Sequence, residues 1–154
     1  MNFHDYLNRQ NNEDRRAFVI HYPAKHGKTS FARGICETRQ DAYLLDLQRY
    51  FLEHPELPPI QQCGPSILKD LLLSLDRPER VLVIDNPDFL LNTWSKEEKR
   101  AFVHWLRIQL RSPADTEKTL IFVIQSDDVL AVADDMRNSY GEPRVLALNK
   151  FDAL

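Results

Sequence analysis

Apolar residues gather along the chain in five short runs, which are separated by longer polar or amphipathic segments. Within each run the apolar residues are nearly continuous rather than alternating with polar ones. Runs of this kind and length predict strands that are buried on both faces, as in a parallel sheet. The five runs span residues 16–21, 42–47, 80–85, 119–125 and 144–148.

The segments between the runs carry apolar residues at helical spacing. Pro65 suits the first turn of one such segment, and Ser95 with Glu98 has the spacing of a capping box that starts another. Strands that alternate with helices predict an α/β fold with helices on both faces of the sheet. We expect helices over residues 29–39, 66–75, 96–111 and 128–139.

Length and composition favour one domain. The 154 residues, of which 43% are hydrophobic and 28% charged, suit a single domain over residues 1–154. Residues 1–14 are expected to form a short N-terminal helix and a polar linker, with disorder over residues 8–14. The net charge of -3 gives no overall attraction to nucleic acid or to anionic membranes. Because no apolar stretch could span a bilayer or form a signal-peptide core, we expect a cytoplasmic protein.

A candidate phosphate-binding loop follows the first predicted strand. The chain there reads Gly27-Lys28-Thr29-Ser30 and then enters a predicted helix. In this setting backbone amides and the helix N-terminus bind phosphate, Lys28 supplies positive charge, and Thr29 offers a hydroxyl to Mg²⁺. The alternative is a vestigial loop in which Lys28 only packs locally. The expected ATP-binding residues are Ala24, Lys25, His26, Gly27, Lys28, Thr29 and Ser30.

One position departs from the pattern G-x-x-x-x-G-K-S/T. Its first glycine would stand where this chain has Tyr22. That glycine mainly relieves crowding where the strand turns into the loop, whereas the amides that bind phosphate come from the later residues. We therefore expect Tyr22 to change the shape of the loop rather than abolish phosphate binding.

A second motif lies at the end of the third predicted strand. Val81-Leu-Val-Ile-Asp85 has the form of a Walker B strand, whose carboxylate holds Mg²⁺ beside the phosphate loop. The next residue, where hydrolytic proteins of this class usually have a glutamate, is Asn86, and an amide is a poor general base. Asp88 could substitute for that base or could serve as a turn residue, and the turn is favoured. Gln125, at the end of the fourth strand, is a candidate sensor of the γ-phosphate.

The segments YPAKHGKTS, VLVIDNPDFLL and FVIQS resemble P-loop ATPases of the AAA and STAND type over residues 16–148. The resemblance implies a three-layer fold with the sheet order 5-1-4-3-2 and nucleotide at the carboxyl ends of the strands. A helical lid, which such ATPases carry after the fifth strand, is not expected here. A neighbouring subunit would then complete the site, with Arg137 or Arg144 as an arginine finger in trans.

A small P-loop chain without a lid also resembles the BrxF family of type III BREX phage-defence systems. This resemblance implies a role in bacterial antiviral defence, in a homo-oligomer or in a complex with a larger ATPase.

GTP is an alternative ligand. Asn149-Lys150-Phe151-Asp152 matches N-K-x-D, the guanine-recognition motif of GTPases, and follows the fifth predicted strand. However, Asp85-Asn86-Pro87-Asp88 lacks the glycine of the GTPase switch motif. The helix expected between the second and third strands also stands where Ras-like GTPases have a hairpin. ATP is therefore the favoured nucleotide.

A basic stripe offers a function of another class. Arg100, His104, Arg107 and Arg111 would share one face of the helix from Lys96. Such a stripe is usually a solvated face, but it could bind an acidic partner or a DNA backbone. Two functions remain at this stage. One is an ATP- and Mg²⁺-dependent switch or weak ATPase, and the other is a non-hydrolysing adaptor on a P-loop scaffold.

Overall fold

Five parallel strands form one sheet in the order β2-β3-β4-β1-β5. The computed structural model describes residues 1–23, 28–125 and 135–154, without the side chains of residues 28 and 29. The predicted α/β class and the predicted strand order, 5-1-4-3-2 when read from the other edge, are both confirmed. The strands are β1 Phe18–Tyr22, β2 Ala42–Asp46, β3 Val81–Asp85, β4 Thr119–Gln125 and β5 Val145–Ala147.

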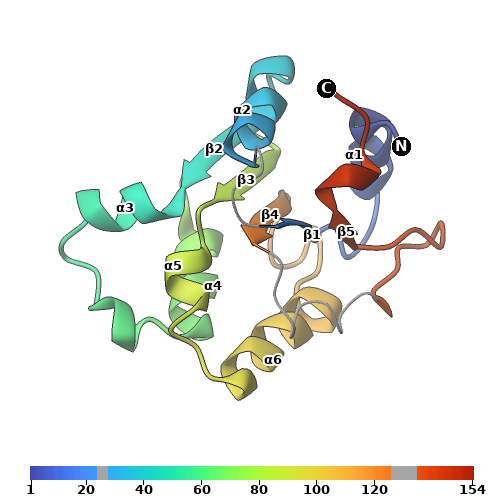
Figure 1. The fold of residues 1–154 in the computed structure, drawn as a ribbon. Helices are drawn as coiled ribbons and strands as arrows, with labels where there is room; N and C mark the ends of the chain where they lie inside the picture. Colours follow the sequence, from blue (N-terminus) through green and yellow to red (C-terminus); the bar gives the residue numbers. More distant parts are fainter. Residues whose placement is uncertain (24–27, 126–134) are drawn as a thin grey trace.

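Helices cover both faces of this sheet (Figure 1). On one face, α1 and α2 pack against side chains of the central strands, and on the other face α4, α5 and α6 do so. Alternate residues of each strand point to opposite faces, so both layers are apolar, as the continuous runs predict. The helices are α1 Phe3–Gln10, α2 Lys28–Thr38, α3 Leu47–Glu53, α4 Pro65–Ser74, α5 Asp88–Leu91 and α6 Lys96–His104, with short turns η1 Ile60–Gln62, η2 Trp105–Gln109 and η4 Leu148–Lys150.

The capping box at the start of α6 forms as predicted. The Ser95 hydroxyl accepts from the Glu98 amide at 3.1 Å, and the Glu98 carboxylate accepts from the Ser95 amide at 3.0 Å. The end of this helix is different from the prediction. The α-helix stops at His104, and η2 continues it as a π-helical turn to Gln109, so Arg111 lies beyond the helix.

The predicted helix over residues 128–139 is wrong at its end, and residues 126–134 lie outside the described part. Arg137 forms an isolated antiparallel bridge with Pro143 rather than a helical turn. The side chain of Asn138 accepts from the backbone amides of Tyr140 and Glu142, both at 2.9 Å. A side chain that binds nearby amides in this way favours a turn over a helix.

Residues 8–14, predicted to be disordered, are held in place. Helix α1 continues through Gln10, and the side chains of Gln10 and Asn11 are buried. The backbone carbonyl of Asn11 accepts from Arg80 at 2.8 Å, and its side chain accepts from the Thr119 hydroxyl at 2.5 Å. These bonds tie the polar segment to the starts of β3 and β4, which compensates for its lack of apolar residues.

An ion pair joins α1 to the turn before β5. The Arg9 guanidinium donates to both carboxylate oxygens of Glu142, at 2.8 and 2.7 Å. This hydrogen bonding holds the pKa of Glu142 below its ordinary value of 4.5. The pKa of Glu142 is thus lower in the folded protein than in the unfolded chain. The pair therefore stabilises the fold fully above pH 4.5, and this stabilisation is lost as the pH falls through the lowered pKa.

Replacing Glu142 by glutamine should therefore lower the free energy of unfolding by roughly 1 kcal/mol at pH 7, and by much less at pH 3. Urea unfolding at the two pH values measures this difference. Glu53→Gln is the matched control, because Glu53 pairs with Arg49 on an exposed helix surface and should matter little at either pH. An equal loss for Glu142→Gln at both pH values would contradict the prediction.

Candidate functional site

Polar side chains end three neighbouring strands on the face covered by α2. Asp46 ends β2, Asp85 ends β3 and Gln125 ends β4. The apolar core between the sheet and helices α1 and α2 is called here the α2 layer. Each of the three polar residues lies two positions after an apolar residue of this layer, so all three share that face. The carboxyl ends of parallel strands meet at one edge of the sheet, and this edge is where ligands bind in open α/β sheets.

Helix α2 begins at the same edge. Strand β1 ends at Tyr22, and after residues 23–27 the helix begins at Lys28, inside the G-K-T sequence as predicted. Helix α2 then packs across β2, β3 and β4. Residues 24–27 and the side chains of Lys28 and Thr29 are outside the described part, while Ser30 is exposed in the first turn of α2. A strand therefore precedes this segment and a helix follows it, which is the order of elements that a phosphate loop needs.

The position of Tyr22 explains how the chain does without the first glycine of the motif. Tyr22 is still part of β1, opposite Gln125 of β4, and its side chain is 2% exposed within the α2 layer. The backbone there is strand rather than loop, so it has no need of the conformational freedom of glycine. The ring is part of the buried core at the end of β1.

Asp85 is buried at the carboxyl end of β3, with 1% of its surface exposed. The Asn86 amide donates to Asp85 Oδ1 at 3.0 Å, and the Asn86 side chain donates to Asp46 Oδ1 at 3.3 Å. Asn86 has a φ of +56°, a left-handed conformation that asparagine tolerates better than most residues. Asn86 thus links the two carboxylates, a role that the sequence did not suggest.

Asp46 is the site residue that sequence reasoning missed. It lies opposite Asp85 in the register of β2 and β3. Its Oδ1 also accepts from the Arg49 amide at 3.2 Å, which caps α3. The signal was available, because the run Ala42 to Asp46 ends in aspartate just as Val81 to Asp85 does, but the predicted strand continued through Leu47.

Asp88 acts as a structural residue. It begins α5, and its Oδ1 accepts from the Gln125 amide at 2.9 Å, which joins the end of β4 to the segment after β3. The favoured interpretation of Asp88 as a turn residue agrees with this contact. The contact also fixes the backbone of Gln125, whose side chain is exposed at the sheet edge.

A pocket of about 410 Å³ opens beside the two carboxylates. Asp85 and Asp46 are part of its lining, together with Arg33 from α2 and Arg49 from α3. Arg49 is paired with Glu53 at 2.9 Å, whereas Arg33 makes no ion pair with any residue of the described ranges. The pocket therefore combines negative charge beside the strand ends with positive charge on the adjoining helices. The remaining lining residues are Tyr43, Leu44, Leu45, Tyr50 and Glu53.

His21 lies one residue before the end of β1, on the opposite face of the sheet. Burial lowers the pKa of His21 below 6.5, so the imidazole is neutral at pH 7. Within the residues that the structure describes, there is no group of three or more histidine, cysteine, aspartate or glutamate side chains that could hold a metal ion. A divalent ion at Asp85 would therefore need other ligands, such as a hydroxyl or phosphate oxygens.

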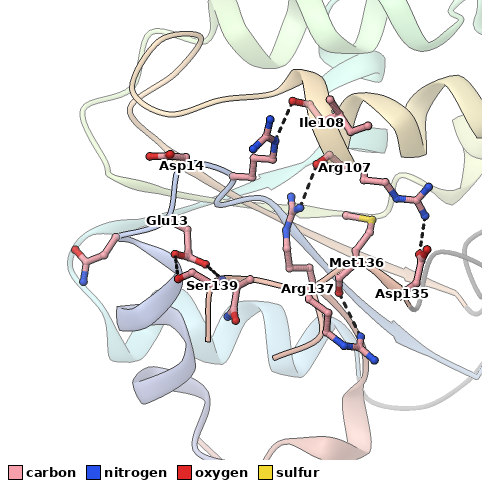
Figure 2. Close-up of a pocket in the computed structure, with 12 residues that line it drawn as sticks. Glu13, Asp14, Arg107, Ile108, Asp135, Met136, Arg137 and Ser139 are labelled. Carbon is pink, nitrogen blue, oxygen red and sulfur yellow. Dashed lines mark hydrogen bonds and ion pairs between the residues drawn. The ribbon is translucent and has the colours of Figure 1, made fainter. Parts of the chain in front are cut away.

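Arg137 and Arg144, the two arginines proposed as fingers, lie near the amino ends of the strands, away from the edge that holds Asp85. The Arg144 amide donates to the Met136 carbonyl, and the Arg144 carbonyl accepts from the Val19 amide, so both segments adjoin the start of β1. Figure 2 shows Arg137 on a separate pocket of about 710 Å³, together with Glu13, Asp14 and Arg107. Arg137 is thus not brought to Asp85 within one chain.

Arg144 cannot serve as a finger in this conformation, because its side chain is buried. It is 3% exposed and donates to the backbone carbonyls of Ala17 at 3.0 Å, Leu106 at 2.6 Å and Arg107 at 3.4 Å. Burial lowers the pKa of Arg144 to about 10, so it stays charged at neutral pH. Arg144 therefore joins the segment before β1 to η2 as a structural residue, a role called here the Arg144 brace. This corrects the expectation that Arg144 could be an arginine finger.

The predicted basic stripe is not continuous. Arg100 and His104 are exposed on α6, but Arg107 lies in the π-helical turn and pairs with Asp135 at 2.7 Å (Figure 2). Arg111 follows the end of the helix, and its amide donates to Asp115. The π turn changes the residue spacing, and so the four cations do not share one helix face.

The N-K-x-D sequence lies at the C-terminal end of the chain. Asn149 and Lys150 are exposed in η4, and Phe151 is buried in the α2 layer. The Asp152 carboxylate lies 3.3 Å from the N-terminal amine of Met1. The Asp152 carboxylate, which would bind guanine in a GTPase, thus forms an ion pair with the amine of Met1.

Across the described residues, no helix has both the length and the apolar character needed to cross a bilayer. Comparison with known proteins does not assign the chain to a family, since no protein-family model matches it and a search of the curated proteins gives no significant match.

Proposed function

We propose that this chain is a P-loop protein of the AAA and STAND type, which binds ATP with Mg²⁺ and acts as a nucleotide-dependent switch with slow hydrolysis. The observation that carries the proposal is the buried Asp85 at the carboxyl end of β3, on the face where α2 begins directly after Gly27. A buried carboxylate at this edge, beside a helix that begins within the G-K-T sequence, is what the binding of Mg²⁺ and phosphate requires.

The residues of the site fit this ligand. Asp85 and the Thr29 hydroxyl would hold Mg²⁺, the amides of residues 24–30 would bind the phosphates, and Lys28 would neutralise their charge. The ion supplies charge neutralisation at the phosphates when bound. Gln125, at the neighbouring strand end, would contact the terminal phosphate.

Assembly with a second subunit would bring a further arginine to the site. Arg137 lies near the amino ends of the strands, whereas Asp85 lies at a carboxyl end. Arg137 could therefore serve only the site of a neighbouring copy or of a larger ATPase. The resemblance to the BrxF family supports a role of this kind within a bacterial antiphage complex.

Thermal unfolding with and without nucleotide tests the proposal. ATP with Mg²⁺ at a hundred times its dissociation constant should stabilise the protein by about 2.7 kcal/mol, which raises the melting temperature by roughly 5–10 °C. The shift should shrink when Mg²⁺ is chelated, and GTP should give a smaller shift than ATP. An unchanged melting temperature with both nucleotides would refute the proposal and favour an adaptor, whereas a larger shift with GTP would favour the N-K-x-D alternative.

A further inference from the structure

Asp46 has the position of a second functional carboxylate beside Asp85. The two residues lie opposite each other on β2 and β3, which are adjacent parallel strands about 4.8 Å apart. Both point to the α2 face, and both line the same pocket of about 410 Å³. Asp46 is only partly buried, so its carboxylate is accessible from the pocket, unlike the enclosed Asp85.

The hydrogen bonds of Asp46 leave one of its oxygens open. The Asn86 side chain and the Arg49 amide both donate to Oδ1, at 3.3 and 3.2 Å. Oδ2 accepts no hydrogen bond from any residue in the described ranges. The two donors fix the orientation of the carboxylate and leave Oδ2 without a donor among the described residues, which is the arrangement that a general base needs.

The other polar groups at this edge are less suitable for that task. Asn86 cannot accept a proton, and its amide group is already directed at Asp46. Asp88 Oδ1 accepts from the Gln125 amide, and Glu53 is paired with Arg49. Arg33, on the α2 side of the pocket, provides a positive charge for an anionic group that enters it.

We propose that Asp46 is the catalytic base of slow ATP hydrolysis at this site, a role that rests on the function proposed above. Asp46 Oδ2 accepts a proton from the attacking water, while the water oxygen bonds to the terminal phosphorus. The bond from that phosphorus to the bridging oxygen breaks, and that oxygen leaves with ADP. The proton then passes from Asp46 to the released phosphate, so that ATP and water give ADP and inorganic phosphate with the carboxylate restored.

Asp46→Asn is the decisive variant, because asparagine keeps the shape of the side chain. Its oxygen still accepts from Asn86 and Arg49, and asparagine caps helices as well as aspartate does. Hydrolysis should fall by about 10²- to 10⁴-fold in a single-turnover assay with excess protein and γ-labelled ATP. The affinity for ATP with Mg²⁺, measured by calorimetry, should stay within about threefold of that of the wild type.

A second measurement does not depend on turnover. ADP with Mg²⁺ and aluminium fluoride mimics the state in which water attacks, so a residue that binds this water should favour the mimic over ATP. We expect the wild type to bind the mimic more tightly than ATP, and Asp46→Asn to lose at least tenfold of this preference. Asp70→Asn, which changes an exposed carboxylate on α4, is the control that should leave both measurements unchanged.

The outcomes separate the two proposals. If the wild type binds no ATP, the proposed function fails and the role of Asp46 fails with it. If ATP binds but is not hydrolysed, or if Asp46→Asn hydrolyses it at the wild-type rate, the role of Asp46 is overturned while nucleotide binding stands. Equal losses of ATP affinity and hydrolysis in Asp46→Asn would also overturn it, because they would indicate a binding residue.

Discussion

Replacing Lys28 by alanine is expected to abolish the stabilisation of the protein by ATP and Mg²⁺. The lysine side chain would supply a charged donor to the terminal phosphates, and one such interaction contributes about 1.5–3 kcal/mol. Loss of the upper value weakens binding by roughly 150-fold, since each 1.4 kcal/mol is tenfold. Titration calorimetry gives the dissociation constant directly, and thermal unfolding at a fixed ATP concentration shows the lost shift.

The control for this variant is another lysine at the start of a helix. Lys96 is the first residue of α6, is exposed, and belongs to a helix that packs on the opposite face of the sheet from α2. Lys96→Ala should therefore bind ATP as the wild type does. Tight ATP binding by Lys28→Ala would show that Lys28 does not bind the phosphates, and would contradict the assignment of the G-K-T segment as a phosphate loop.

Replacing Arg144 by methionine is expected to lower the free energy of unfolding by about 3 kcal/mol, far more than the loss of an exposed arginine would. Methionine fills the space but donates no hydrogen bond, so the buried carbonyls of Ala17 and Leu106 lose their charged donor. Each buried polar group left unpaired costs about 1–3 kcal/mol. Removing the buried charge also removes the free-energy cost of its desolvation. We expect the cost of the two carbonyls that lose their donor to be larger, so the net effect is a loss of stability.

Urea or thermal unfolding measures this loss, which corresponds to roughly 6–12 °C in melting temperature. Arg144→Lys keeps the charge but not the planar fork that reaches three carbonyls, so its stability should lie between those of the wild type and Arg144→Met. Arg100→Met removes an exposed arginine from α6 and should change stability by less than about 0.5 kcal/mol. If Arg144→Met were as stable as Arg100→Met, Arg144 would not be the brace that its contacts indicate.

The strands were predictable because burial on both faces leaves a continuous apolar signal. Strand β4 has the predicted bounds, and β3 begins one residue later than predicted. The errors fall where side-chain hydrogen bonds decide the backbone. Asn138 favours a turn over the predicted helix, and Asn11 anchors the segment predicted to be disordered. Such long-range and local polar contacts leave no periodic pattern in a sequence.

The candidate site was predictable where it depends on chain order and hidden where it depends on register. Asp85 was predicted because a motif ends there, and the start of α2 was predicted because the G-K-T sequence stands at that point of the chain. That Asp46 lies opposite Asp85 follows from the pairing of β2 with β3, which one sequence does not specify. The burial of Arg144 was missed for a related reason, because an arginine beside a strand is usually exposed.

Three rings link the two ends of the chain to the helix that starts the site. Phe31, in the first turns of α2, makes an edge contact with Phe3 of α1 at 5.3 Å and stacks with Phe151 at 6.2 Å. Figure 1 shows α1 and both termini close together at one side of the sheet. Because these rings share one core, α1 and the start of α2 should open as one unit in native-state hydrogen exchange. A ligand held at the N-terminus of α2 would then slow exchange in α1 without touching it, which makes the N-terminal helix a remote reporter of occupancy.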